Sequence, residues 1–215
     1  GSGWDIAPAG DSLLYRDTRG ELALPVPTLT GPYQAENAGL AAAMLRHQQA
    51  VTIDDAAIAD GIRTATWPAR MQRLGDGPLT RRLRPEQRRH GVWLDGAHNE
   101  SAAAAIAGSW GRDAPTAIVI GMLANKDADG VIRHLLDRRG ETHVVAVPVP
   151  SHAHHQPEAL AAIARRHGAA STATAETIGD ALDLIAAAGT GESVLIAGSL
   201  YIAGGVLAAN GESPT

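Results

Sequence analysis

From Gly91 onward, short apolar runs alternate with longer amphipathic stretches, and no other feature of the sequence constrains the fold as much. The apolar runs have the length and the Val and Ile content of buried strands. They are residues 92–94, 117–120, 143–147 and 194–197. The stretches between them have a helical pattern, over residues 100–110, 128–139, 157–167 and 177–188. Because parallel strands are joined by crossover helices, this alternation predicts an α/β fold with a Rossmann-like, mostly parallel sheet flanked by helices.

The beginning of the chain follows a different pattern. Apolar residues on either side of a Gly-containing turn predict a hairpin of residues 13–15 and 21–24. Two helices are expected after it, one over residues 35–48 and one over residues 55–63. Asp54 precedes the second helix and is a suitable N-cap, since its carboxylate can accept a backbone N–H of the first turn.

A domain boundary is expected where Trp67 is followed by Pro68, because proline disfavours helical geometry in the residue before it. We therefore expect residues 1–66 and residues 67–215 to be separate parts of the chain, the first without a complete core of its own. The last six residues, 210–215, are polar, and we expect them to form a loose, dispensable tail.

The charge distribution disfavours a nucleic-acid surface. The formal net charge is −5, and acidic and basic residues are interspersed. One local basic cluster is interpreted as a solvated surface, with a polyanion site as the alternative. The cluster consists of Arg81, Arg82, Arg84, Arg88 and Arg89.

The sequence has no cysteine, which excludes disulfides and thiolate metal sites. It also lacks a run of eighteen apolar residues and a start that resembles a signal peptide. A cytoplasmic protein without membrane contact is therefore expected.

The segment Trp93–Asn99 carries the strongest local sign of chemistry, because an apolar strand ends there in polar residues. Ligands of open α/β sheets bind at the carboxyl ends of the strands. The carboxylate of Asp95 could accept hydrogen bonds from ribose hydroxyls at such a position. Alternatively, Asp95 or Asn99 could only cap the helix that follows.

Five blocks of the sequence, in order, resemble the folylpolyglutamate synthase/dihydrofolate synthase family of the Mur ligase superfamily, in its C-terminal part. The signature is Leu94–Asn99, followed by an alanine-rich helix. The other blocks are Tyr33–Ala38, Trp67–Gln72, Gly121–Asp127 and Ala197–Tyr201. In the Trp67–Gln72 block Ala69 stands where the family usually has glycine, which reduces the freedom of the backbone beside Arg70.

The resemblance implies that residues 1–66 are the incomplete tail of a central ATP-binding domain and that residues 67–215 are a C-terminal Rossmann-like ligase domain. It also implies an ATP site shared between domains. In it Asn37 would bond the adenine edge, Arg70 would approach the phosphates and Asp95 would hold the ribose. His98 would contact the nucleotide or the incoming glutamate, and Ser199 could contact glutamate or, as an equal alternative, cap a helix. No catalytic residue is expected in this chain.

Other motifs are given no ligand. Lys126 and Asp127 follow a strand. The resemblance implies that their loop faces the ligand, although a surface turn is an equal alternative. The run His152–His155 lacks the carboxylates that would complete a metal site, and we expect it to be a polar loop. Residues 189–193 lack the Gly-Lys-Ser/Thr ending of a phosphate loop and are expected to form a turn.

The resemblance implies the C-terminal portion of an ATP-dependent ligase that adds L-glutamate to folate or dihydropteroate through an acyl phosphate, in folate and one-carbon metabolism. ATP, magnesium, L-glutamate and the folate acceptor would be its ligands. Because the sequence has no Walker-type loop, the phosphate contacts and metal ligands are expected in an N-terminal ATPase domain outside this chain, which alone would be inactive. The alternatives are a Mur-type peptidoglycan ligase fragment and a non-catalytic nucleotide-binding module.

Overall fold

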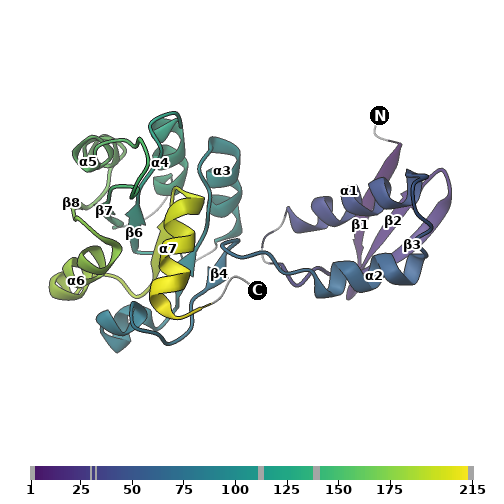
Figure 1. Ribbon diagram of the computed structural model, residues 1–215, viewed down its shortest axis with the longest axis horizontal. Coiled ribbons are helices and arrows are strands. Elements are labelled where there is room, and N and C mark those ends of the chain that lie inside the picture. The colour runs from purple at the N-terminus through teal and green to yellow at the C-terminus, as the bar shows by residue number, and fades with distance from the viewer. Residues whose placement is uncertain (1–2, 30, 32, 111–113, 138–140, 213–215) are drawn as a thin grey trace. The chain divides into compact units, whose positions relative to one another are not determined.

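The computed structural model describes residues 3–29, 31, 33–110, 114–137 and 141–212. The chain divides into two compact units, Gly1–Trp67 and Pro68–Thr215, which are drawn in Figure 1 and described separately. None of the helices in these residues has the length and apolarity needed to span a membrane.

The smaller unit combines an antiparallel sheet with two helices. Its strands β1 (Trp4–Ala9), β2 (Ser12–Asp17) and β3 (Gly20–Pro25) pair in sequence order. The predicted hairpin corresponds to β2 and β3, in which Leu14 is opposite Ala23. The predicted helices are α1 (Gln34–His47) and α2 (Asp55–Thr64), and the Asp54 carboxylate accepts the N–H of Ala57 as expected. Strand β1 was not predicted.

The smaller unit contains a small apolar core between its sheet and helices. Large apolar side chains also remain outside it, including Leu40 and Met44 on α1, which are 49% and 65% exposed. The buried cluster consists of Leu13, Tyr15, Leu24, Ala38, Ala42, Ala43, Ile58 and Ile62.

A polar network closes one end of this core around Asp17, whose side chain is fully buried. The Asp17 carboxylate accepts the Tyr15 hydroxyl at 3.0 Å, Nε of Arg46 at 3.0 Å and the N–H of Arg19 at 2.8 Å. Burial by itself favours the neutral carboxyl, but the hydrogen bonds from Arg19, Tyr15 and Arg46 together hold the pKa of Asp17 below its usual range. Burial, with the neighbouring Asp17 carboxylate, raises the pKa of Tyr15 to about 12.

We expect Asp17→Ala to destabilise the smaller unit by about 3 to 5 kcal/mol at neutral pH, because Arg46 would remain buried without its main partner. The folded-state pKa of Asp17 lies below the unfolded value of about 3.9. The stabilisation is therefore present above pH ~4 and disappears as the pH falls through the folded-state pKa. Amide exchange of β2 measured between pH 7 and pH 3 checks this. The control Asp11→Ala, in the exposed turn between β1 and β2, should change little, and equal effects of both substitutions would contradict the prediction.

The larger unit contains a six-stranded sheet in the order β4-β5-β9-β6-β7-β8. All neighbours are parallel except β4, which pairs antiparallel with β5. This confirms the predicted α/β fold. The strands are β4 (Gln72–Arg73), β5 (Val92–Leu94), β6 (Ala117–Ile120), β7 (His143–Ala146), β8 (Ser171–Thr174) and β9 (Val194–Ala197). Strand β9 is the last in sequence but lies between β5 and β6.

Helices cover both faces of this sheet (Figure 1). Helices α3 (Glu100–Ser109), α4 (Ala128–Leu136) and α5 (Pro157–Arg166) pack on one face. Helices α6 (Ile178–Ala188) and α7 (Leu200–Asn210) pack on the other, with the short 3-10 turns Thr80–Arg82 and Pro85–Arg88. The predicted helix over residues 128–139 ends at Leu136, and residues 138–139 lie outside the described part.

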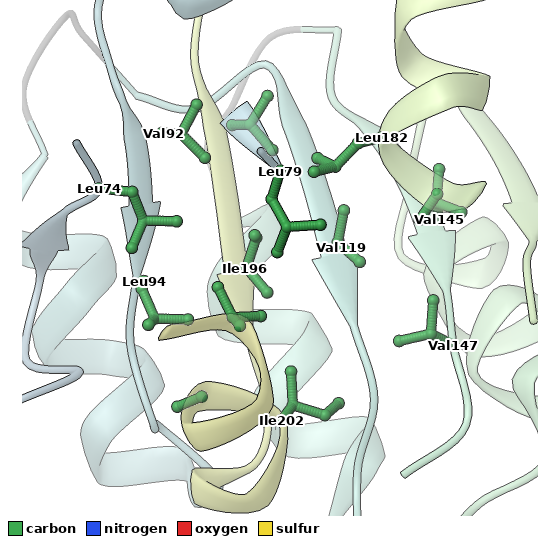
Figure 2. Packing of buried hydrophobic residues seen from close by; sticks show 14 of the residues in the cluster. Leu74, Leu79, Val92, Leu94, Val119, Val145, Val147, Leu182, Ile196 and Ile202 are labelled. Atoms are coloured by element: carbon green, nitrogen blue, oxygen red, sulfur yellow. The ribbon is translucent and has the colours of Figure 1, made fainter. Parts of the chain in front are cut away.

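Strand residues contribute alternately to the two faces, as the period of a strand requires. In β6, Val119 belongs to the cluster under α6 and α7, whereas Ile118 and Ile120 belong to the cluster under α3, α4 and α5. Figure 2 shows the first of these clusters, with Val119 and Ile196 of the sheet facing Leu182 of α6 and Ile202 of α7. Every residue of β6 and β9 is buried.

Two strands and one helix of the larger unit were not predicted. Strand β8 has the half-exposed sequence Ser-Thr-Ala-Thr, and β4 has only two residues, so neither produces an apolar run. Helix α7 contains two adjacent glycines, Gly204 and Gly205, which disfavour helix formation in isolation. It forms because Ile202, Val206 and Leu207 are buried against the sheet.

The polar C-terminal residues are not a loose tail, so the prediction for Asn210 and Glu212 was wrong. Asn210 is 3% exposed, and its side-chain oxygen accepts the N–H groups of Leu79 at 3.1 Å and Thr80 at 3.2 Å. The Glu212 carboxylate accepts the N–H of Gly75 at 2.9 Å. Hydrogen bonds of this kind offset the burial of polar atoms, and the composition alone did not show them. Residues 213–215 lie outside the described part.

The local basic cluster is largely ion-paired on the surface. Arg81 and Arg88 both contact the Asp76 carboxylate at 2.9 Å, and Arg82 pairs with Asp183 of α6. These exposed contacts agree with a solvated surface and contribute little individually to stability.

Candidate functional site

The candidate site lies at the carboxyl edge of the six-stranded sheet. Asp95 follows β5 and Ser199 follows β9 by two residues. Since β5 and β9 are parallel neighbours, with Leu94 opposite Ile196, both residues are on the same edge. The loops after β6 and β7 reach this edge as well. The connections around the central strands therefore gather polar groups where open α/β sheets bind ligands.

Asp95 is almost completely buried, at 2% exposure. One carboxylate oxygen accepts the N–H of Met71 at 2.7 Å and the other accepts the N–H of Ala97 at 2.8 Å. Burial raises the pKa of Asp95 above its usual range, while these two N–H groups and the nearby Arg70 and His98 oppose the increase. Each oxygen retains a further lone pair that could accept a hydroxyl.

Arg70 occupies a turn whose flanking residues have unusual backbone angles. Ala69 has a φ of 55° and Met71 a φ of 46°, both in the left-handed region. Residues with a Cβ pay about 1 to 2 kcal/mol each for this conformation. Ala69, which stands where the resemblance implies a glycine, thus adopts a left-handed angle although it carries a Cβ. The Arg70 guanidinium lies beside Gly96, since a Cβ at Gly96 would be 3.6 Å from its Nη1.

The helix after β5, α3, is capped by Asn99 and not by Asp95. Of the two residues that the sequence offered as a cap, Asn99 is therefore the one that serves. The Asn99 side-chain oxygen accepts the N–H of Ala102 at 2.9 Å, and Asn99 is exposed. His98 is half-buried, with its Nδ1 2.9 Å from the carbonyl oxygen of Gly96. Its Nε2 has no hydrogen bond among the contacts of the described residues, so this nitrogen remains open to a ligand.

Ser199 is 2% exposed and occupies the N-cap of α7. Its hydroxyl oxygen accepts the N–H of Tyr201 at 3.2 Å, so the capping alternative is present in the structure. The residue before it, Gly198, has a φ of 107°, and a Cβ there would be 2.5 Å from the carbonyl oxygen of Gly121. Only glycine allows the β9 loop to approach the β6 loop so closely.

The loops after β6 and β7 are joined along their length. The N–H of Ala124 donates to Ala153, and the N–H of His155 donates to Met122. The His155 side chain adds a contact of 2.8 Å between its Nε2 and the Lys126 carbonyl oxygen. Lys126 is half-buried, and its side chain has no hydrogen bond or ion pair among the described contacts.

The histidine run is a loop, and each of its three rings has a structural contact, including the one of His155 with Lys126. The His152 ring stacks on Tyr201 at a centroid distance of 3.6 Å, and Nδ1 of His154 lies 2.6 Å from the His152 carbonyl oxygen. Among the described residues, no three His, Asp or Glu side chains gather in a geometry that could hold a metal ion. The stack between His152 and Tyr201 was not predicted, because the residues are far apart in the sequence.

Asn37 belongs to the smaller unit, whereas the other candidates belong to the larger one. It is exposed on the first turn of α1, and its amide donates to the Gln34 side chain at 3.0 Å. Both residues line a mainly apolar cavity of about 210 Å³ between α1 and α2, together with Leu45 and Ile62.

Comparison with known proteins identifies the family. Residues 82–209 match the model of the dihydrofolate synthetase C-terminal domain, which is more than half of the chain. The chain belongs to this family. The resemblance to folylpolyglutamate and dihydrofolate synthases that the sequence motifs indicated is therefore confirmed.

Relatives of this dihydrofolate synthetase C-terminal domain are folylpolyglutamate synthases. A probable bifunctional folylpolyglutamate synthase/dihydropteroate synthase of Halobacterium salinarum is 36% identical over 184 residues, which cover 84% of this chain and 20% of that protein. The folylpolyglutamate synthase of Lacticaseibacillus casei is 27% identical over 203 residues, 92% of this chain and 43% of the relative. The chain thus spans about a fifth to two fifths of the curated relatives it matches.

A solved structure of the same family has the same fold. The Mycobacterium tuberculosis folylpolyglutamate synthase complexed with ADP and AMPPCP superimposes with a TM-score of 0.78 and 26% identity. The match covers the whole of this chain and 49% of that protein.

Proposed function

We propose that this chain is the C-terminal portion of an ATP-dependent ligase that adds L-glutamate to folate or dihydropteroate. The observation that carries the proposal is the family match over residues 82–209, which includes the carboxyl edge with Asp95, His98 and Ser199. A Mur-type peptidoglycan ligase is a weaker alternative, because the matching family is the folate branch. A cytoplasmic location belongs to the same proposal, since ATP and L-glutamate are abundant there.

ATP is the ligand that we assign to the groups at this edge. The Arg70 guanidinium has the planar donor set that suits phosphate oxygens, and the lone pairs that Asp95 does not use for Met71 and Ala97 could accept the ribose hydroxyls. Asn37 of the smaller unit keeps the role that the family resemblance implies, a hydrogen bond to the adenine edge through its exposed side-chain amide. His98 and Ser199 would orient the nucleotide or the glutamate. We assign no magnesium ligand to these residues.

The proposed reaction transfers the γ-phosphoryl group of ATP to the carboxylate of the acceptor, which gives an acyl phosphate and ADP. The glutamate amine then attacks the acyl carbon, loses a proton, and expels inorganic phosphate as the amide forms. ATP and magnesium supply the activated phosphoryl group and its charge neutralisation. The contribution of this chain is to bind and orient the nucleotide and the amine, which lowers the entropic part of the barrier.

A binding experiment tests the assignment of Arg70. If the guanidinium contacts phosphate, Arg70→Ala should weaken ADP binding about 10-fold or more, because a charge-assisted hydrogen bond contributes about 1.5 to 3 kcal/mol. Adenosine binding should not change, since adenosine has no phosphate. Titration calorimetry with both ligands would measure this.

The matched control for that experiment is Arg73→Ala. Arg73 is an exposed arginine three residues away on β4, opposite Trp93. We expect it to leave ADP affinity within about 2-fold of the original value. An equal loss in both variants, or unchanged ADP affinity in Arg70→Ala, would rule out the phosphate assignment.

A further inference from the structure

Two residues of the larger unit adopt left-handed backbone angles although neither is glycine and both are buried. They are Ala69, with a φ of 55° and 2% exposure, and Met71, with a φ of 46° and 5% exposure. Such residues persist only where the surrounding structure holds them, and they concentrate at ligand sites. Arg70 lies between them, so its direction depends on the same turn.

Three hydrogen bonds hold this turn, and two of them come from the loop after β5. The N–H of Met71 donates to the Asp95 carboxylate at 2.7 Å, and the N–H of Gly96 donates to the Ala69 carbonyl at 2.9 Å. The third is local, from the N–H of Ala69 to the Gln72 side chain at 2.9 Å. Only the bond to Asp95 joins a charged group, and charge-assisted bonds are the stronger kind.

The Asp95 carboxylate also fixes its own loop, because its second oxygen accepts the N–H of Ala97 at 2.8 Å. It therefore bridges two segments that are more than twenty residues apart, the Arg70 turn and the loop before α3. Asp95 is 2% exposed. A carboxylate this deeply buried, with both oxygens already bonded to backbone N–H groups, is suited to holding the backbone in place.

We propose that Asp95 is the positioning residue for Arg70: its carboxylate holds the strained turn from Ala69 to Met71 in the conformation that directs the Arg70 guanidinium to the carboxyl edge beside Gly96. This role extends the ligand site proposed above and is compatible with a ribose contact through the remaining lone pairs. It rests on the geometry of the larger unit and requires no bound nucleotide. Its test can therefore be separated from the proposed ligase function.

The experiment uses NMR of the whole chain without ligand and follows two signals, the Nε–H resonance of Arg70 and the amide exchange rate of Met71. In Asp95→Ala we expect the Arg70 resonance to move toward that of a solvated arginine. We also expect the Met71 amide to exchange at least about 10-fold faster, because its acceptor is lost. Asp95→Asn, which retains one acceptor oxygen, should give smaller changes and replaces Asp95→Ala if that variant does not fold.

The deciding variant is Ala69→Gly combined with Asp95→Ala. Glycine adopts the left-handed angle without steric cost, so the turn no longer needs to be held against strain. We expect this double substitution to return the Arg70 resonance at least halfway to its original position. A carboxylate with only a general stabilising role would not be replaced by a glycine at residue 69.

The control is Asp127→Ala. Asp127 also follows a strand of the sheet and accepts one backbone N–H, from Gly130 at 3.1 Å, but it is exposed and contacts no strained turn. It should leave the Arg70 and Met71 signals unchanged. The proposal is overturned if Asp95→Ala and Asp95→Asn both leave these signals at their original values. It is also overturned if Ala69→Gly fails to restore the Arg70 resonance in a folded protein.

Discussion

Purified alone, the 215-residue chain should form no folate–glutamate amide when it is given ATP, magnesium, L-glutamate and tetrahydrofolate or dihydropteroate. The sequence offers candidate partners for adenine, ribose and phosphate but has no Walker-type loop. Such a loop directs backbone N–H groups, a lysine and a metal-binding hydroxyl at the β- and γ-phosphates. Because catalysis depends on stabilising the charge of the transferred phosphoryl group, turnover without them should fall below detection.

The positive counterpart is an assay in which the chain is mixed with a separately produced phosphate-loop domain of a folylpolyglutamate synthase. We expect ligation to appear on mixing, measured as labelled glutamate incorporated into the folate product. Arg70→Ala should reduce this activity by about 10²-fold or more, by analogy with the loss of other groups that stabilise transition-state charge. Arg73→Ala is again the matched control. Ligation by the chain alone would contradict the proposed division of labour.

Asn210→Ala should be the most destabilising polar substitution at the C-terminal end of the larger unit. It leaves the buried N–H groups of Leu79 and Thr80 without their acceptor, and it removes the donor to the Gly75 carbonyl. At about 1 to 3 kcal/mol for a buried group left unsatisfied, the combined cost should be about 2 to 4 kcal/mol. The Tm should fall by about 4 to 16 °C, as measured by calorimetry.

Asn125→Ala is the matched control, because Asn125 is exposed and makes no hydrogen bond among the described contacts. Its Tm should change by no more than about 2 °C. A chain shortened after Ala209 should resemble Asn210→Ala or be less stable still, since it also lacks Glu212. If the shortened chain has the same Tm as the original one, the C-terminal residues are dispensable and the hydrogen bonds of Asn210 and Glu212 do not contribute to stability.

The sequence predicted the parallel sheet well because its central strands are buried on both faces. Runs such as Ala117–Ile120 and Val194–Ala197 contain no polar residue, which distinguishes them from the amphipathic helices around them. The edge strands could not be found in this way. Strand β8 is half-exposed and β4 consists of two residues, Gln72 and Arg73, whose pairing depends on the position of β5.

The candidate site was predictable only in part. The position of Asp95 after a strand follows from the apolar run before it, and the chemistry of Arg70 follows from its side chain. The bond between Asp95 and the Met71 N–H could not be predicted, because it joins segments 24 residues apart and uses a backbone atom that every residue has. The left-handed angle of Ala69 could not be predicted either, because alanine rarely adopts this angle and the neighbouring sequence does not indicate it.

The position of β9 also determines when the sheet can form during synthesis. This strand separates β5 from β6, although almost one hundred residues of chain lie between β5 and β9. A nascent chain that has been made only as far as β8 therefore has the pair β4-β5 and the group β6-β7-β8 but lacks the strand that joins them, and the edges of β5 and β6 remain unpaired. Long-range pairing of this kind slows folding and exposes such edges to aggregation. We expect the larger unit to depend on chaperone protection until residues 194–212 have left the ribosome.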